Sequence, residues 1–225
     1  AWEEPQGAGL STGIRTVSGV GPSQNIQWAA PTILGTSLVL AWAPDMGTSD
    51  TGDKATGGVA TAGKGRGLDA TININPSLGT EILSGLNLFA GAHETYVHNR
   101  NTTIEEETYQ GVAGVTYSLG PVSVGWQVSG DYLGETTAED YNAYKSHAFG
   151  ISFNVNDDLS VSYGKHQTRK AGYVTSHAQS GTPASRLVTV ESIQAAYTMG
   201  GASFRVADVN ADNVFFSADK NRSAT

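Results

Sequence analysis

The sequence of 225 residues contains no cysteine. Disulfide bonds, thiolate metal sites and thiol nucleophiles are therefore excluded. Charged residues are scarce as well, at 15% of the chain against about 25% in average soluble domains. The formal net charge is −8, with 21 acidic and 13 basic side chains. An acidic chain of this kind lacks the clustered Lys and Arg that contact phosphates, so we expect no nucleic-acid partner.

Long apolar runs are also absent, because no window approaches the roughly 18 consecutive apolar residues of a membrane helix. This absence does not exclude a membrane β-barrel, whose strands are apolar only at alternate positions. The first residues, AWEEPQGAGL, show neither the charged nor the apolar region of a signal peptide. We therefore expect a mature chain or a piece of one.

What the sequence does contain is alternation with a period of two, typical of strands. In residues 117–129, YSLGPVSVGWQVS, one face carries Val122, Val124 and Trp126, whereas Ser, Gly and Gln occupy the other face. The polar face has almost no charge, unlike the water-facing side of a soluble sandwich. This pattern indicates an apolar face toward lipid and a polar face toward a wet lumen. Tyrosines at the expected girdle positions near strand ends are Tyr117, Tyr163 and Tyr197.

Short turns recur about every 40 residues and alternate strictly with longer polar connections, the layout of an outer-membrane barrel. Helical periodicity is not evident. The expected fold is therefore all-β, a transmembrane antiparallel β-barrel with about ten readable strands. These strands are expected at 23–29, 33–42, 67–75, 82–97, 107–118, 122–133, 143–155, 159–169, 187–198 and 202–213.

Three segments carry a family resemblance: QNIQWAAPTILGTSLVLAWAPD, GVTYSLGPVSVGWQVS and AFGISFNVNDDLSVSYGKH. They resemble the general porins of proteobacteria, particularly the alphaproteobacterial members. The resemblance implies a homotrimer of 16-stranded barrels in the outer membrane of a Gram-negative bacterium. Each barrel would pass small hydrophilic solutes and ions by diffusion, in contact with lipid and lipopolysaccharide.

The resemblance also divides the chain, which we expect to form a single barrel domain over residues 1–225. Residues 1–22 correspond to the end of a constriction loop folded into the pore, 23–213 to barrel strands, and 214–225 to the start of the last outer loop. On this alignment five strands precede the loop, ten are readable, and one follows. We therefore expect the chain to be incomplete at both ends.

Charged and polar side chains on lumen-facing positions are the candidate pore-lining residues. Arg205 and Asp69 alternate with apolar neighbours, and His93 lies on the polar face of its strand. The resemblance places Glu3 and Glu4 on the constriction loop and Arg15 where the chain returns to the wall. Opposed acidic and basic groups at a narrow point select solutes by charge.

Other chemistries have weaker support in the sequence. Residues 208–219, DVNADNVFFSAD, are similar to a calcium loop, but Asn213 replaces the required Gly and Asp219 the final Glu. A Ser–His–acid hydrolase would lack a nucleophile elbow motif. We expect no enzyme, catalytic residue, metal site or cofactor. The alternative function is a secreted β-rich adhesin or carbohydrate-binding domain.

Overall fold

The computed structural model describes residues 12–14, 17, 19, 24–44, 47–48, 63–76, 81–99, 104–137, 140–174, 187–218 and 220–225. Within these residues, twelve strands form one antiparallel sheet. The strands are β1 (Ile26–Ala29), β2 (Thr36–Ala43), β3 (Gly47–Thr48), β4 (Gly63–Ile74), β5 (Leu86–Asn99), β6 (Ile104–Leu119), β7 (Val122–Thr137), β8 (Asp140–Asn154), β9 (Leu159–Val174), β10 (Leu187–Met199), β11 (Ala202–Asp212) and β12 (Arg222–Ala224). One helical turn, α1 (Glu81–Ser84), precedes β5, and a 3-10 turn, η1 (Val214–Phe216), follows β11. None of the helices in these ranges is long and apolar enough to cross a membrane.

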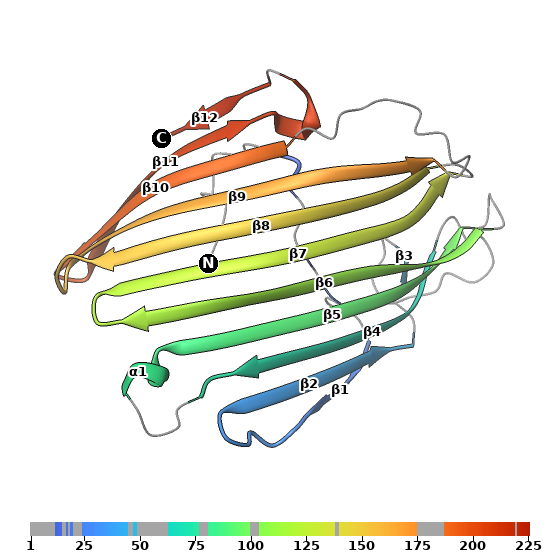
Figure 1. Cartoon of the computed structure of the whole chain (residues 1–225), viewed down its shortest axis with the longest axis horizontal. Coiled ribbons are helices and arrows are strands. Elements are labelled where there is room, and N and C mark those ends of the chain that lie inside the picture. Colours follow the sequence, from blue (N-terminus) through green and yellow to red (C-terminus); the bar gives the residue numbers. More distant parts are fainter. Residues whose placement is uncertain are drawn as a thin grey trace.

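The sheet is a meander in which each strand pairs with its neighbours in chain order, while the short β3 pairs with β4 to one side (Figure 1). The hairpin turns at one end are tight. At the β6–β7 turn, Gly120 has a φ of 57°, a left-handed conformation that glycine adopts without steric cost. β1 and β12 end the order of pairing, so the sheet is not closed.

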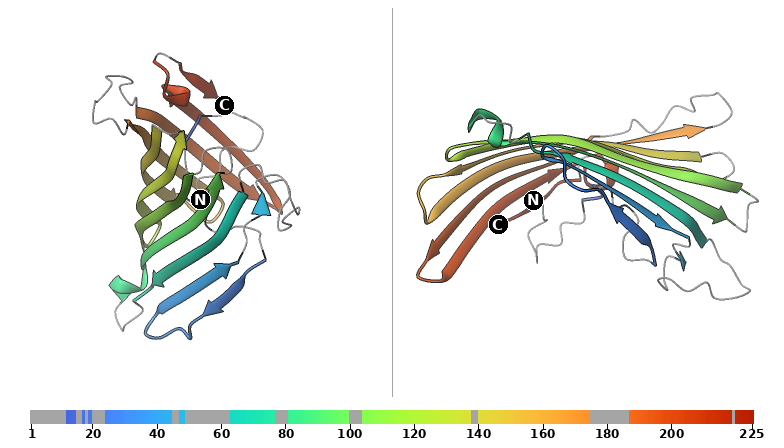
Figure 2. Two further views of the ribbon diagram at one scale, coloured as in Figure 1. Left: turned by 90° about the vertical axis from the view of Figure 1, so that its right-hand side faces the viewer. Right: turned by 90° about the horizontal axis from the view of Figure 1, so that it is seen from below.

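The two faces of the sheet differ sharply in polarity, and the sheet curves into a trough (Figure 2). Gly19 lies against Asp69, which identifies the face of Asp69 as the concave one. Buried polar side chains belong to this concave face: His93, Thr95, Ser129, Asp131, Ser146, His166, Thr168 and Ser192. Large exposed apolar side chains belong to the convex face: Leu40, Trp42, Leu68, Ile72, Leu88, Trp126, Phe149, Ile151, Phe153, Val161, Ile193, Phe204 and Val206. This distribution is the inverse of that in a soluble sandwich, whose apolar faces are buried between sheets.

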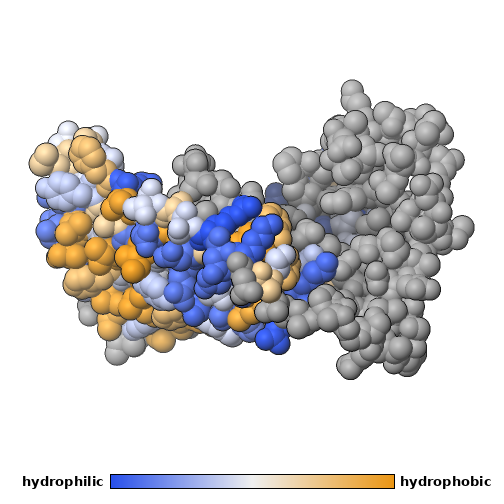
Figure 3. Space-filling model, turned by 90° about the horizontal axis from the view of Figure 1, so that it is seen from above, coloured by the Kyte–Doolittle hydropathy of each residue, from blue (hydrophilic) through white to orange (hydrophobic). Residues whose placement is uncertain are grey.

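The strands are longer than an apolar membrane band requires. β6, β7 and β9 each have 16 residues, a length of roughly 53 Å at 3.3 Å per residue. A tilt of about 45° would give a height of roughly 37 Å, compared with an apolar band of about 25 Å. Seen from the β12 side, hydrophobic side chains gather toward the end with the tight turns, and hydrophilic ones lie nearer the middle (Figure 3). The loop ends of the strands therefore extend beyond the apolar band.

The prediction of an all-β antiparallel sheet is confirmed, and all ten expected strands are present. The structure differs from the prediction in several details. The strand expected from residue 82 begins at Leu86, because residues 81–84 form the helical turn α1. Residues 222–224 are not only loop, since they return as β12 and pair with residues 209–211 of β11.

Candidate functional site

A single row of directly paired residues crosses the concave face from β4 to β9. We call this row the polar ladder, and it consists of Asp69, His93, Gln110, Asp131, Tyr144 and Lys170. Neighbouring strands lie about 4.8 Å apart, so each side chain of the ladder lies within reach of the next. The row has two carboxylates in its first four positions and an ammonium group at its far end.

The first part of the ladder is a hydrogen-bonded chain centred on His93. Its Nδ1 contacts Asp69 Oδ1 across the β4–β5 pair, and its Nε2 contacts the hydroxyl of Thr95, two residues along β5. His93 and Thr95 are 7% and 2% exposed. Such buried polar groups are stable only because they are bonded to one another. An acid, an imidazole and a hydroxyl in line resemble a hydrolytic triad. The burial of the Thr95 hydroxyl, however, leaves no approach for a substrate.

The middle of the polar ladder contacts Gly19, which belongs to the part of the chain before β1, here called the N-terminal segment. The side chain of Gln110 accepts a hydrogen bond from the N–H of Gly19, at 3.3 Å, and donates one to Asp131 Oδ1, at 3.2 Å. Gly19 has a φ of 66°, and a Cβ placed there would lie 3.0 Å from an oxygen of Asp69. A left-handed backbone pressed against a carboxylate therefore favours glycine at this position.

The far end of the ladder is covered by the turn that follows β11. The ring of Phe216 packs 5.7 Å from that of Tyr144, and Lys170 Nζ lies 5.9 Å from the centre of the Tyr144 ring. The N-terminal segment reaches this turn as well, because the N–H of Phe215 donates to the carbonyl of Thr12 at 2.9 Å. Thr12 and Gly19 thus contact the concave side of the molecule at two separate places.

The structure brings together two of the predicted site residues, Asp69 and His93. Arg205 also lies on the concave face, opposite Ala196, but on β11, near the other edge of the sheet. Glu3, Glu4 and Arg15 lie outside the described residues. The other four residues of the polar ladder were not among the predicted site residues: Gln110, Asp131, Tyr144 and Lys170. Their lumen-facing alternation was available as a signal, but the register that aligns them was not.

The first five residues of the calcium-like motif, 208–212, form the end of β11 and not a loop. Asp208, Asn210 and Asp212 occupy alternate positions on the convex face of β11, and Asn210 donates to Asp208 at 3.2 Å. An extended strand cannot wrap these side chains around one ion as a calcium loop does. Asp219 is outside the described residues. In the part of the chain that the structure describes, no three His, Asp or Glu side chains are grouped for metal binding.

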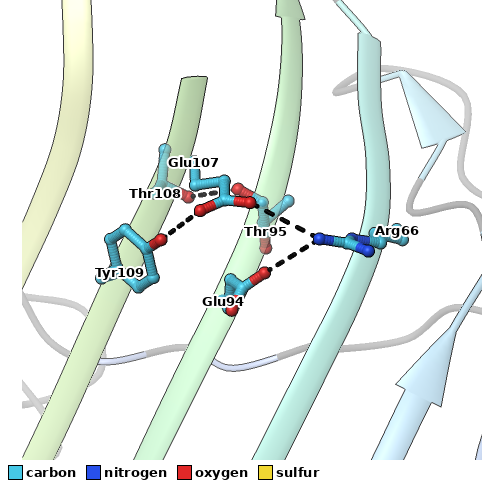
Figure 4. A network of polar contacts seen from close by, with 6 residues as sticks. All are labelled: Arg66, Glu94, Thr95, Glu107, Thr108 and Tyr109. Atoms are coloured by element: carbon cyan, nitrogen blue, oxygen red, sulfur yellow. Dashed lines mark hydrogen bonds and ion pairs between the residues drawn. The ribbon is translucent and has the colours of Figure 1, made fainter. Parts of the chain in front are cut away.

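A separate ionic cluster marks the loop side of the apolar band on the convex face (Figure 4). The guanidinium of Arg66 lies 3.4 Å from Glu94 and 3.5 Å from Glu107, and the Tyr109 hydroxyl donates to Glu107. The Tyr109 ring stacks on Tyr132 with their centres 6.4 Å apart. Aromatic and charged side chains together are typical of the membrane–water interface. This cluster therefore indicates where the apolar band ends.

A groove of about 1050 Å³ lies on the convex face, behind the ladder. Small residues on successive strands form its floor: Ala70, Ala92, Gly111 and Gly130. Apolar and aromatic side chains such as Trp42, Leu68 and Tyr132 flank it. Because it is apolar, it offers nothing to a hydrophilic solute, and the polar ladder remains the candidate site.

An antiparallel meander with an apolar outer face and a polar inner one defines the architecture of outer-membrane channel proteins. In agreement, the chain is similar to the crystal structure of the outer membrane channel DcaP of Acinetobacter baumannii, with a TM-score of 0.65 and 13% sequence identity. The likeness covers 92% of this chain and 62% of that channel, so the chain spans less than two thirds of its length. No known family model matches the sequence, and no curated protein matches it. At this identity the likeness shows a shared fold.

Proposed function

We propose that the chain forms the wall of a passive outer-membrane diffusion channel, a porin for small hydrophilic solutes and ions. The observation that carries this proposal is the inverted polarity of the sheet. Ile193 and Phe204 are more than half exposed on the convex face, whereas Thr168 and Ser192 are buried on the concave one. Apolar area left in water is costly, at about 25 cal/mol per Å², so the convex face requires lipid as its solvent.

The free edges of the sheet make closure part of the same proposal. β1 and β12 each lack a second partner among the described strands. In lipid, unpaired backbone N–H and C=O groups cost several kcal/mol each. Further strands beyond the described sheet would pair with both edges and complete the barrel, as the resemblance to 16-stranded porins implies. The homotrimer and the alphaproteobacterial type follow from the same resemblance.

Solute selection would occur where the N-terminal segment approaches the wall. The contacts of Gly19 with Asp69 and Gln110 support an inserted segment at this level of the trough. Residues 1–22 would then narrow the passage, with Glu3 and Glu4 on this segment and Arg15 where it returns to the sheet. Asp69, His93 and Arg205 would line the sheet around it. Such a channel needs no cofactor and no catalytic residue.

Swelling of proteoliposomes tests the diffusion function. Vesicles containing the protein should swell quickly in a pentose, more slowly in a disaccharide and hardly at all in a large dextran, because a water-filled pore excludes by size. Protein-free vesicles from the same lipid are the control. If incorporated, folded protein gives the swelling rate of empty vesicles in every sugar, the channel function is wrong. The secreted adhesin or carbohydrate-binding domain would then be favoured.

A further inference from the structure

Only one of the two carboxylate oxygens of Asp131 has a hydrogen-bond partner among the described residues. This residue of β7 is 5% exposed on the concave face. Its Oδ1 accepts a hydrogen bond from Gln110, whereas its Oδ2 is buried and has no hydrogen-bond partner among the described residues. Most buried polar atoms in native proteins are bonded, and each exception calls for an explanation, such as an ion or a water molecule.

No cationic side chain of the described residues forms an ion pair with Asp131 either. Its partners in the polar ladder are Gln110 on one side and Tyr144 on the other, both formally neutral. The ammonium group of Lys170 lies over the ring of Tyr144. The other carboxylate of the ladder, Asp69, contacts His93. Asp131 is therefore the acidic member of the ladder whose charge has no described counter-ion.

We propose that Asp131 is a specificity-determining residue that makes the ladder section of the channel favour cations, both inorganic ions and solutes with a protonated amine. This inference rests on the proposed channel function. A fixed charge in a narrow passage with low-dielectric walls raises the local concentration of counter-ions. Its field is screened less there than at an open surface, where the Debye length is about 8 Å at physiological salt.

The replacement Asp131→Asn tests the proposal with little steric change. An asparagine carbonyl in place of Oδ1 still accepts from Gln110, so the variant removes the charge and keeps the hydrogen bond. The matched control is Asp158→Asn, which removes the same charge from an exposed position in the tight turn between β8 and β9. Circular dichroism and resistance of the folded form to sodium dodecyl sulfate verify that each variant folds.

Two readouts in planar bilayers complete the test: the reversal potential across a KCl gradient, and the block of potassium current by butylammonium. We expect the parent and Asp158→Asn to favour K⁺ and to be blocked, and Asp131→Asn to shift toward equal permeability and lose the block. A folded Asp131→Asn channel with the selectivity and block of the parent would overturn the role of Asp131. A parent protein without any conductance would instead overturn the channel function itself.

Discussion

Val124 on β7 lies directly opposite Ile151 on β8, on the convex face, and their neighbours Ser123 and Ser152 form a pair on the concave face. Two adjacent rows of the same hairpin thus face opposite sides of the sheet. Ile151 is 39% exposed although it is fully apolar. If the convex face contacts lipid, these two rows must respond in opposite ways to a charge.

The replacement Val124→Arg or Ile151→Arg should destabilise the protein by about 2–4 kcal/mol where the site lies near the bilayer midplane. The matched variants Ser123→Arg and Ser152→Arg should fold and change conductance instead, because their side chains reach the wet lumen. Urea titration of protein refolded into vesicles measures the free energy of unfolding. Equal tolerance in both rows would mean that the faces are reversed.

Close packing within the sheet makes a second prediction, at Gly114 on β6. A Cβ at this position would lie 2.4 Å from the ring of Phe89 and 2.8 Å from the carbonyl oxygen of Trp126. Gly114→Ala should therefore lower the free energy of unfolding by about 1–3 kcal/mol, the usual cost of overpacking. Gly111→Ala on the same strand is the control, since a Cβ there meets nothing closer than 3.9 Å. Equal stability of the two variants in urea titrations would contradict the packing around Phe89.

Arg205, Glu3 and Glu4, the three charged residues proposed to surround the passage, make a third prediction. Removing Arg205 with Arg205→Gln should raise the preference for cations, and replacing Glu3 and Glu4 together with Gln should lower it, without loss of folding. Reversal potentials at low ionic strength measure both effects, because salt screens fixed charges. The variant Asp157→Asn in an exposed turn provides a charge control. If neither change alters the reversal potential, these residues do not line the narrow part of the channel.

The contact between the N-terminal segment and η1 makes a fourth prediction, which uses the absence of native cysteine. A Cβ on Gly13 would lie 3.2 Å from Phe215 Cα, within reach of a disulfide between the two positions. The pair Gly13→Cys and Phe215→Cys should cross-link on mild oxidation, seen as a mobility shift that a reductant reverses. Gly13→Cys with Gly200→Cys should not, because Gly200 lies in an open turn. Failure of the first pair to cross-link would contradict the placement of the N-terminal segment against η1 in the trough.

Much of the fold was predictable because apolar and polar side chains alternate along the strands of a membrane barrel. In residues 122–128, strict alternation showed which side chains share a face, and the glycine-containing turn at Gly120 fixed where the chain reverses. The loop ends were less predictable. β9 continues to Val174, beyond the predicted end at 169, because residues 170–174 pair with residues 140–144 of β8.

The candidate site was only partly predictable for a related reason. A period of two tells which face Asp131 lies on, but the residue opposite it depends on register, and a strand has no local signal for that. Asp69 and His93 were both placed on the polar face, yet their contact required the pairing of β4 with β5. The role of Gln110 also depends on Gly19, which is 91 positions away in the sequence.

Single-channel recording in planar bilayers tests the central claim most directly, since it detects a continuous aqueous path through the protein. The purified protein in detergent, added at low concentration to one side of the membrane, should insert in discrete steps of conductance. Steps that occur in groups of three would also support the trimer. Well-folded protein that enters the bilayer and produces no conductance steps would contradict the proposal that this sheet forms the wall of a channel.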